Sequence, residues 1–179
     1  DRFVYYEHQN GAMMRMDVTG GSILSGGPSS ENIRPRLPRG SAPLRFSWYT
    51  PFFISPHNPR TLYAGGNRVL KTTDRGATWT AVSPELGDTA TADRAVAPTG
   101  AMTMLTESTI AAGMLAGGTE GGRVWLTTND GTDWRRIDAG LPRKWVSRVV
   151  LSHRDAGTVY VSFTGFREDD TRAYLFASS

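Results

Sequence analysis

Acidic and amide side chains alternate with glycine at two places in the chain, where they could bind a cation or close a tight turn. The first is residues 72–79, TTDRGATW, and the second is residues 127–134, TTNDGTDW. A calcium loop of the EF-hand type needs oxygen ligands spread over about twelve residues and a glutamate that closes the loop. Neither segment supplies them, so we expect no metal here and assign no cofactor to the chain.

The same residue types are typical of a structural turn. The side-chain oxygen of Asp or Asn accepts backbone N–H groups within a tight loop, and glycine adopts the positive φ that other residues resist. Both segments fit the pattern Ser/Thr-x-Asp/Asn-x-Gly-x-Thr/Asp-Trp, 55 residues apart. The closing tryptophan can return to a sheet and bury roughly 150–250 Å². We predict a structural role for Thr72, Asp74, Gly76, Thr78, Trp79, Thr127, Asn129, Gly131, Asp133 and Trp134.

The residues around these two segments repeat as well, which indicates an architecture of repeated units. Short apolar runs separated by turn residues precede each segment, such as 62–65 and 69–71 before the first. Four short strands in about 50 residues are typical of one propeller blade. A degenerate copy of the motif is visible at residues 15–21, and Ser178 would begin a further copy.

The composition favours an all-β protein. Hydrophobic residues make up 39% of the 179 residues, which suits a folded domain. Twenty glycines, ten prolines and many aromatic residues favour strands joined by tight turns. We predict β-propeller blades, about three of them with four antiparallel strands each, in an incomplete ring. The chain, 1–179, would be one propeller segment with blade-like units at about 1–30, 45–83, 100–138 and 145–179 and a connecting arm at 31–44.

The charge distribution narrows the class of partner. The net charge is +3, and residues 1–75 carry ten Lys and Arg against five Asp and Glu. Nucleic-acid-binding domains usually carry denser basic clusters, so we predict no nucleic-acid partner. No run of about 18 apolar residues occurs, so we do not expect the chain to span a membrane, and membrane association would come through a partner. The absence of cysteine excludes disulfides and thiolate metal sites.

Arginine supplies eighteen of the twenty basic residues and is the best candidate for contact with a partner. Its planar guanidinium group pairs with carboxylates and stacks on aromatic rings. Several arginines lie in the proline-rich arm, and another lies in a charged hairpin tip at 166–172. The arm is either a solvated connection between blades or a docking arm for acidic groups. The candidate partner-binding residues are Arg34, Arg36, Arg39, Arg45 and Arg167.

We predict no catalytic residues. A typical glycoside hydrolase needs two carboxylates that flank its substrate, and none of the seventeen Asp and Glu stands in a distinctive setting. A sialidase-like glycoside hydrolase is the alternative interpretation, because arginines could hold a substrate carboxylate. The order Ile33-Arg34-Pro35 differs, however, from the Arg-Ile-Pro phrase of sialidases. His57 and His153 follow apolar runs at matching positions, which predicts one repeated structural role rather than a metal site.

With these motifs the chain resembles the Asp-box (BNR) repeat proteins, in particular the large bacterial sortilin-like proteins. The likeness covers residues 3–170 and implies a propeller outside the bacterial cytoplasm, either periplasmic or secreted. Sortilin-type propellers bind peptides and proteins, and related Asp-box propellers assist the assembly of photosystem II. The resemblance implies a protein-binding scaffold or an accessory subunit of a larger membrane or photosynthetic assembly. Beyond the two segments above, it rests on Trp48-Tyr49-Thr50-Pro51, Ser55-Pro56-His57-Asn58-Pro59, Trp145-Val146-Ser147-Arg148 and Ser152-His153-Arg154-Asp155-Ala156-Gly157-Thr158.

Overall fold

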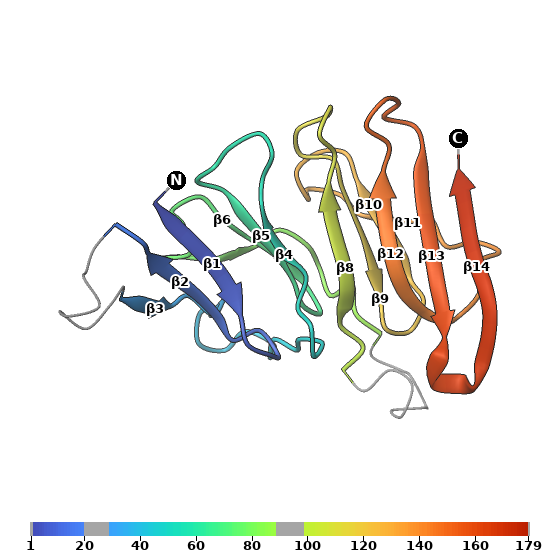
Figure 1. Ribbon diagram of the computed structural model, residues 1–179, viewed down its shortest axis with the longest axis horizontal. Coiled ribbons are helices and arrows are strands. Elements are labelled where there is room, and N and C mark those ends of the chain that lie inside the picture. The colour runs from blue at the N-terminus through green and yellow to red at the C-terminus, as the bar shows by residue number, and fades with distance from the viewer. Residues whose placement is uncertain (1, 20–28, 89–98, 179) are drawn as a thin grey trace.

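The computed structural model describes residues 2–19, 29–88 and 99–178. Within these ranges the chain forms fourteen β-strands in four antiparallel sheets and one short 3-10 helix. Figure 1 shows the sheets side by side, from β1–β3 at the N-terminal end to β12–β14 at the C-terminal end. The all-β prediction is confirmed.

Each sheet takes its strands in chain order, so consecutive strands are neighbours. We number the sheets as blades 1 to 4. Blade 1 consists of β1 Phe3–Glu7, β2 Met13–Asp17 and β3 Ser30–Asn32. Blade 2 consists of β4 Phe52–Ile54, β5 Leu62–Gly65, β6 Val69–Thr72 and β7 Thr80–Ala81. Blade 3 consists of β8 Met102–Glu107, β9 Leu115–Thr119, β10 Val124–Thr127 and β11 Arg135–Arg136. Blade 4 consists of β12 Trp145–Leu151, β13 Val159–Gly165 and β14 Asp170–Ser178, with the 3-10 helix η2 Phe166–Glu168 between the last two.

The described residues thus hold two four-stranded and two three-stranded sheets, where about three four-stranded blades were predicted. The strands of blade 1 are shifted by one position relative to those of blades 2 and 3. β1, β2 and β3 correspond to the second, third and fourth strands of those blades. Its last strand crosses the boundary predicted at residue 30 and takes up the first residues of the arm. The degenerate motif at 15–21 runs into residues 20–28, and the copy beginning at Ser178 runs into residue 179; both extend outside the described residues.

Apolar side chains fill the space between neighbouring blades. Alternate residues of a strand point to opposite faces of its sheet, so Leu62 and Tyr63 of β5 face different neighbours. Leu62 packs toward blade 1 with Met13 and Ile33, whereas Tyr63 packs toward blade 3 with Leu115. The third cluster lies between blades 3 and 4, and its buried residues are Met114, Ala116, Val124, Leu126, Val146, Val149, Leu151, Val159, Val161 and Phe163. Each middle blade is therefore covered on both faces.

Candidate functional site

The first motif closes the turn between β6 and β7. The hydroxyl of Thr72 donates to Asp74 Oδ1 at 2.7 Å and accepts the backbone N–H of Gly76 at 3.0 Å. Asp74 Oδ1 in turn accepts the backbone N–H of Thr78 at 2.9 Å. Gly76 has a φ of +91°, which is the left-handed region that favours glycine. The hydroxyl of Thr72 and the carboxylate of Asp74 therefore make their hydrogen bonds within the turn itself.

The second motif repeats this arrangement between β10 and β11. The hydroxyl of Thr127 donates to Asn129 Oδ1 at 2.9 Å and accepts the N–H of Gly131 at 3.1 Å. Asn129 Oδ1 accepts the N–H of Asp133 at 3.0 Å. An amide therefore serves in this turn as well as a carboxylate does in the first, because both present the same acceptor oxygen.

The tryptophan that ends each motif joins its blade to the preceding one. Trp79 is only 9% exposed, and its Nε1 donates to the backbone oxygen of Ile33 at 2.8 Å. Trp134 is half-buried, and its Nε1 donates to the backbone oxygen of Val82 at 3.0 Å. Both indoles lie in the clusters between blades, so the ten motif residues form two structural corners rather than a ligand site.

The Asp74 carboxyl gives the first corner a pH dependence. Burial would raise its pKa, but hydrogen bonds from Thr72 and Thr78 outweigh burial and lower that pKa from 3.8 to about 2. A carboxyl whose pKa is lower in the folded state stabilises the fold above its unfolded pKa. This contribution is lost as the pH falls through the folded value.

We expect wild-type protein to lose about 1 kcal/mol more unfolding free energy than Asp74→Asn when the pH falls from about 5 to about 2. This figure is below the full value for such a shift because the side chain is partly exposed to solvent. Urea unfolding across that pH range measures the difference. The amide at Asn129 indicates that the variant turn can still form. Identical pH dependence in the two proteins would contradict this role of Asp74.

The two histidines have structural partners. His57 Nε2 lies 2.7 Å from the backbone oxygen of Ser108, and His153 Nδ1 lies 2.8 Å from Thr109 Oγ1. The prediction that they hold matching positions is wrong by one residue. The backbone N–H of His57 donates to Ser55 Oγ, and the backbone N–H of Arg154 donates to Ser152 Oγ. His57 therefore corresponds to Arg154 and not to His153. No group of three or more His, Asp or Glu within the described ranges could hold a metal ion.

We call the end of the sheets opposite the two motif turns the loop end. Arg34 and Arg45 lie there beside Phe46 and Asn67, and Arg167 lies there in η2, whereas Arg36 and Arg39 lie along the arm. The guanidinium carbon of Arg34 lies 5.2 Å from the centre of the Phe46 ring. Arg36 and Arg39 are exposed, and no acidic residue within the described ranges forms an ion pair with any of these three arginines. The arm therefore presents positive charge that the described part of the chain does not neutralise.

Arg45 is different, because its side chain is bound within the fold. Its Nε donates to the backbone oxygen of Thr99 at 2.9 Å, and its Nη2 donates to Glu85 at 2.7 Å. These bonds tie the end of the arm to the segments that flank blade 3. Arg45 thus has a structural role within the fold, and its contact with a partner stays a prediction.

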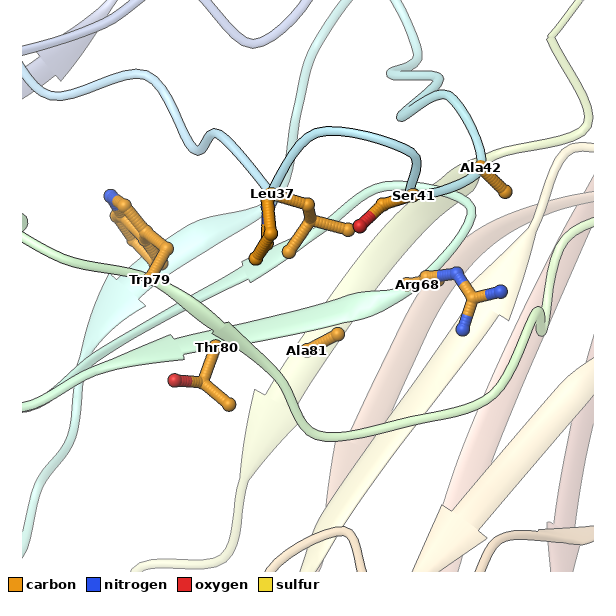
Figure 2. Close-up of a pocket in the computed structure, with 8 residues that line it drawn as sticks. Leu37, Ser41, Ala42, Arg68, Trp79, Thr80 and Ala81 are labelled. Carbon is orange, nitrogen blue, oxygen red and sulfur yellow. The ribbon is translucent and has the colours of Figure 1, made fainter.

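A hollow of about 440 Å³ lies between the arm and the outer strand of blade 2. Figure 2 shows Leu37, Ser41 and Ala42 of the arm beside Trp79 and the β7 residues Thr80 and Ala81. The residues that line it include no acid. The hollow can therefore bind by shape, but its lining offers no carboxylate for acid–base chemistry.

A second hollow, which we call the aromatic groove, lies at the loop end beside the first strands of blades 2, 3 and 4. It encloses about 270 Å³. Trp48 is 51% exposed and Tyr49 is 76% exposed, although both are large aromatic residues. The guanidinium carbon of Arg167 lies 4.1 Å from the centre of the Trp145 ring. The groove is lined by Ser47, Trp48, Tyr49, Thr103, Met104, Trp145, Val146, Ser147 and Arg167.

The groove has a cationic rim. Lys144 Nζ is paired with Glu168 at 2.5 Å and with Asp170 at 3.1 Å, and Arg172 Nη2 is paired with Asp170 at 2.9 Å, so two cations balance these two acids. Hydrogen bonds from Arg172 and Tyr174 hold the pKa of the Asp170 carboxyl far below its ordinary value. Arg167 has no acidic partner among the residues that the structure describes. The groove therefore suits an apolar group with a negative charge beside it.

Sequence reasoning selected Arg167 but did not predict the groove. Trp48, Tyr49 and Trp145 occur in the phrases that carry the family resemblance, yet nothing there marks them as exposed or as neighbours. Trp48 and Trp145 lie 97 residues apart. Only the packing of blade 4 beside blades 2 and 3 brings them to one hollow.

Comparison with known proteins decides the architecture. No protein-family model matches the sequence, and no curated protein matches it. The GH74 xyloglucanase from Xanthomonas campestris superposes with a TM-score of 0.59 and 15% identity, covering 98% of this chain and 27% of that one. YCF48 bound to D1 peptide superposes with a TM-score of 0.52 and 16% identity, covering 98% and 52%. The fold is β-propeller-like.

The propeller prediction is thereby confirmed, and identities this low support the fold alone. The chain spans about a quarter of the xyloglucanase and about half of YCF48. None of the helices in the described part of this propeller is long and apolar enough to cross a membrane.

Proposed function

We propose that this chain is a non-catalytic, extracytoplasmic propeller segment of the Asp-box, sortilin-like kind, which binds a protein partner at the aromatic groove. It would act as a scaffold or as an accessory subunit of a larger assembly, periplasmic or secreted. The two turns with matching Thr, Asp or Asn, Gly and Trp geometry support the Asp-box assignment. The extracytoplasmic location follows from that family resemblance.

The observation that carries this proposal is the exposure of Trp48 and Tyr49 beside the stacked pair of Trp145 and Arg167. Aromatic residues and arginine are enriched where proteins bind each other and supply most hot spots. A hollow of about 270 Å³ is small for a drug-sized ligand, but it suits one protruding side chain of a peptide. YCF48, a solved neighbour, is bound to D1 peptide, so a protein of similar fold takes a peptide ligand.

The charge of the loop end indicates an acidic partner segment. Arg167 supplies the cation at the groove, and Arg34, Arg36 and Arg39 add positive charge along the arm. Paired charges of opposite sign steer association and select the partner. We therefore expect the partner to carry an apolar side chain flanked by Asp or Glu.

Affinity capture from an extracytoplasmic fraction of the source organism tests this proposal. Wild-type protein should recover one partner in stoichiometric amount. Arg167→Glu should lower that partner's affinity at least about tenfold, because it places a like charge opposite the acidic segment. Arg154→Glu is the matched control, since Arg154 is exposed at the opposite end of the sheets. Equal binding by both variants, or a strictly solitary protein, would contradict the proposed site.

The alternative is a sialidase-like glycoside hydrolase. Two deeply buried carboxylates already have partners: Asp88 with Arg123 and Arg143, and Asp138 with Arg136. For this reason the alternative ranks second. Turnover of a fluorogenic glycoside that is abolished by changing one acidic residue would favour the enzyme over the binding module.

A further inference from the structure

The five tryptophans of the chain fall into two groups according to what their indole N–H groups do. The indoles of Trp79, Trp125 and Trp134 each donate to a backbone oxygen elsewhere in the fold, at 2.8 to 3.0 Å. Trp48 and Trp145 line the aromatic groove instead, and neither indole N–H has an acceptor in the part of the chain that the structure describes. The groove therefore holds two hydrogen-bond donors that the fold does not use.

The hydroxyl groups that line the groove between blades 3 and 4 are, in contrast, already engaged. Thr103 Oγ1 donates to the backbone oxygen of Val146 at 2.6 Å. The hydroxyls of Ser147 and Ser162 bond to each other at 2.8 Å. A polar atom that is buried without a hydrogen bond is costly, so the group that fills this part of the groove should be apolar.

The walls of the groove favour a planar ring over an aliphatic group. Trp48 and Tyr49 are exposed, and Trp145 lines the same hollow together with the thioether of Met104. Aromatic rings stabilise one another by more than their buried area alone, and a thioether also packs favourably against a ring. A phenyl ring would gain these contacts on several sides, whereas a leucine side chain would gain only the apolar burial.

Arg167 supplies a cation to the same hollow. Its guanidinium carbon lies 4.1 Å from the centre of the Trp145 ring, and such stacking leaves the in-plane N–H donors available to a carboxylate. Lys144 pairs with Glu168 and Asp170, which fixes the hairpin tip beside the start of β12. The guanidinium group and the two free indoles all donate hydrogen bonds, and an ionised carboxylate only accepts them.

We propose that the aromatic groove is a subsite for a phenylalanine side chain that has Asp or Glu beside it in a partner segment. The ring lies among Trp48, Tyr49 and Trp145, and the neighbouring carboxylate accepts from Arg167 and from a free indole N–H. This inference rests on the proposed function and adds to it the kind of side chain that is recognised. The lining residues lie between positions 47 and 167, in three consecutive blades, so no wall of the subsite is an end of the chain.

Proton–nitrogen NMR of the intact chain tests this subsite, because each of the five indole N–H groups gives its own signal. The probe is the synthetic peptide acetyl-Ser-Asp-Phe-Asp-Ser-amide. Titration should move the signals of Trp48 and Trp145 saturably, while those of Trp79, Trp125 and Trp134 stay in place as internal controls. The variants Trp48→Phe and Trp145→Phe identify the two signals.

Two matched peptides separate shape from charge. With Leu in place of Phe, binding should be about three- to tenfold weaker, because the ring contacts are lost. With Asn in place of both Asp, binding should be at least about fivefold weaker, because the charge-assisted hydrogen bonds are lost. In Trp48→Leu protein the preference for Phe over Leu should fall at least about twofold, which a general loss of stability would not produce.

Equal affinity for the Phe and Leu peptides, or no movement of the Trp48 and Trp145 signals, would overturn the aromatic subsite. The subsite and the proposed function fail in different ways. If the Leu peptide binds equally well and Arg167→Glu still abolishes its binding, the groove remains the partner site without its selectivity for a ring. If the peptide moves the same two signals equally in Arg167→Glu protein, both the subsite and the proposed role of Arg167 are wrong.

Discussion

Replacing Trp79 with alanine is expected to lower the free energy of unfolding by about 3–5 kcal/mol, as large aromatic truncations in cores do. The indole is 9% exposed and lies in the cluster that joins blades 1 and 2. Its removal leaves a cavity there and deprives the Ile33 carbonyl of its donor at 2.8 Å. Urea unfolding followed by circular dichroism measures the change.

Trp48→Ala is the matched control for this prediction. Trp48 is the same residue type but is 51% exposed at the aromatic groove. Its truncation is expected to cost less than about 1 kcal/mol of unfolding free energy, as is usual for surface changes. If both variants lost the same small amount, Trp79 would not be the wedge between the first two blades.

Gly131→Ala is expected to cost about 3 kcal/mol of unfolding free energy, from left-handed strain and steric overlap together. Gly131 has a φ of +88°, and a Cβ there would lie 2.2 Å from the backbone oxygen of Val82. That oxygen is the one that accepts the indole N–H of Trp134. The added methyl group therefore pushes directly on the bond that joins blade 3 to blade 2.

Gly140→Ala separates the two causes. Gly140 has a similar φ of +77°, but a Cβ there would meet nothing within 4 Å. Its replacement should cost only the left-handed strain, about 1 kcal/mol. The unfolding free energies of both variants can be measured by the same denaturant titration. Equal losses would mean that the Val82 backbone moves aside without cost.

Several features of the fold follow from the sequence because their causes are local. A hydroxyl, an Asx oxygen and a glycine within five residues are enough to close the Asp-box turn, and the pattern is readable at Asp74 and Asn129. Strand composition and the 55-residue repeat point to propeller blades in the same way. The offset of blade 1 was not predicted, because its motif is degenerate.

The candidate site could be predicted only in part. Arginine content and the hairpin tip pointed to Arg167, and the charge of the arm pointed to Arg34. The same reasoning selected Arg45, although Glu85 and the Thr99 carbonyl bind its side chain. A sequence does not reveal whether a guanidinium group is already paired, because its partner can lie 40 residues away, as Glu85 does.

The sequence by itself therefore determined the all-β class, the blade repeat and the two corners, since these depend on residues that are neighbours in the chain. Tertiary structure alone decided which side chains meet across blades: Trp48 with Trp145 and Arg167 at the groove, and each indole with a carbonyl of the blade before it. The physical reason is that blade-to-blade packing sets these contacts. That packing depends on the apolar faces of whole sheets and not on any short motif.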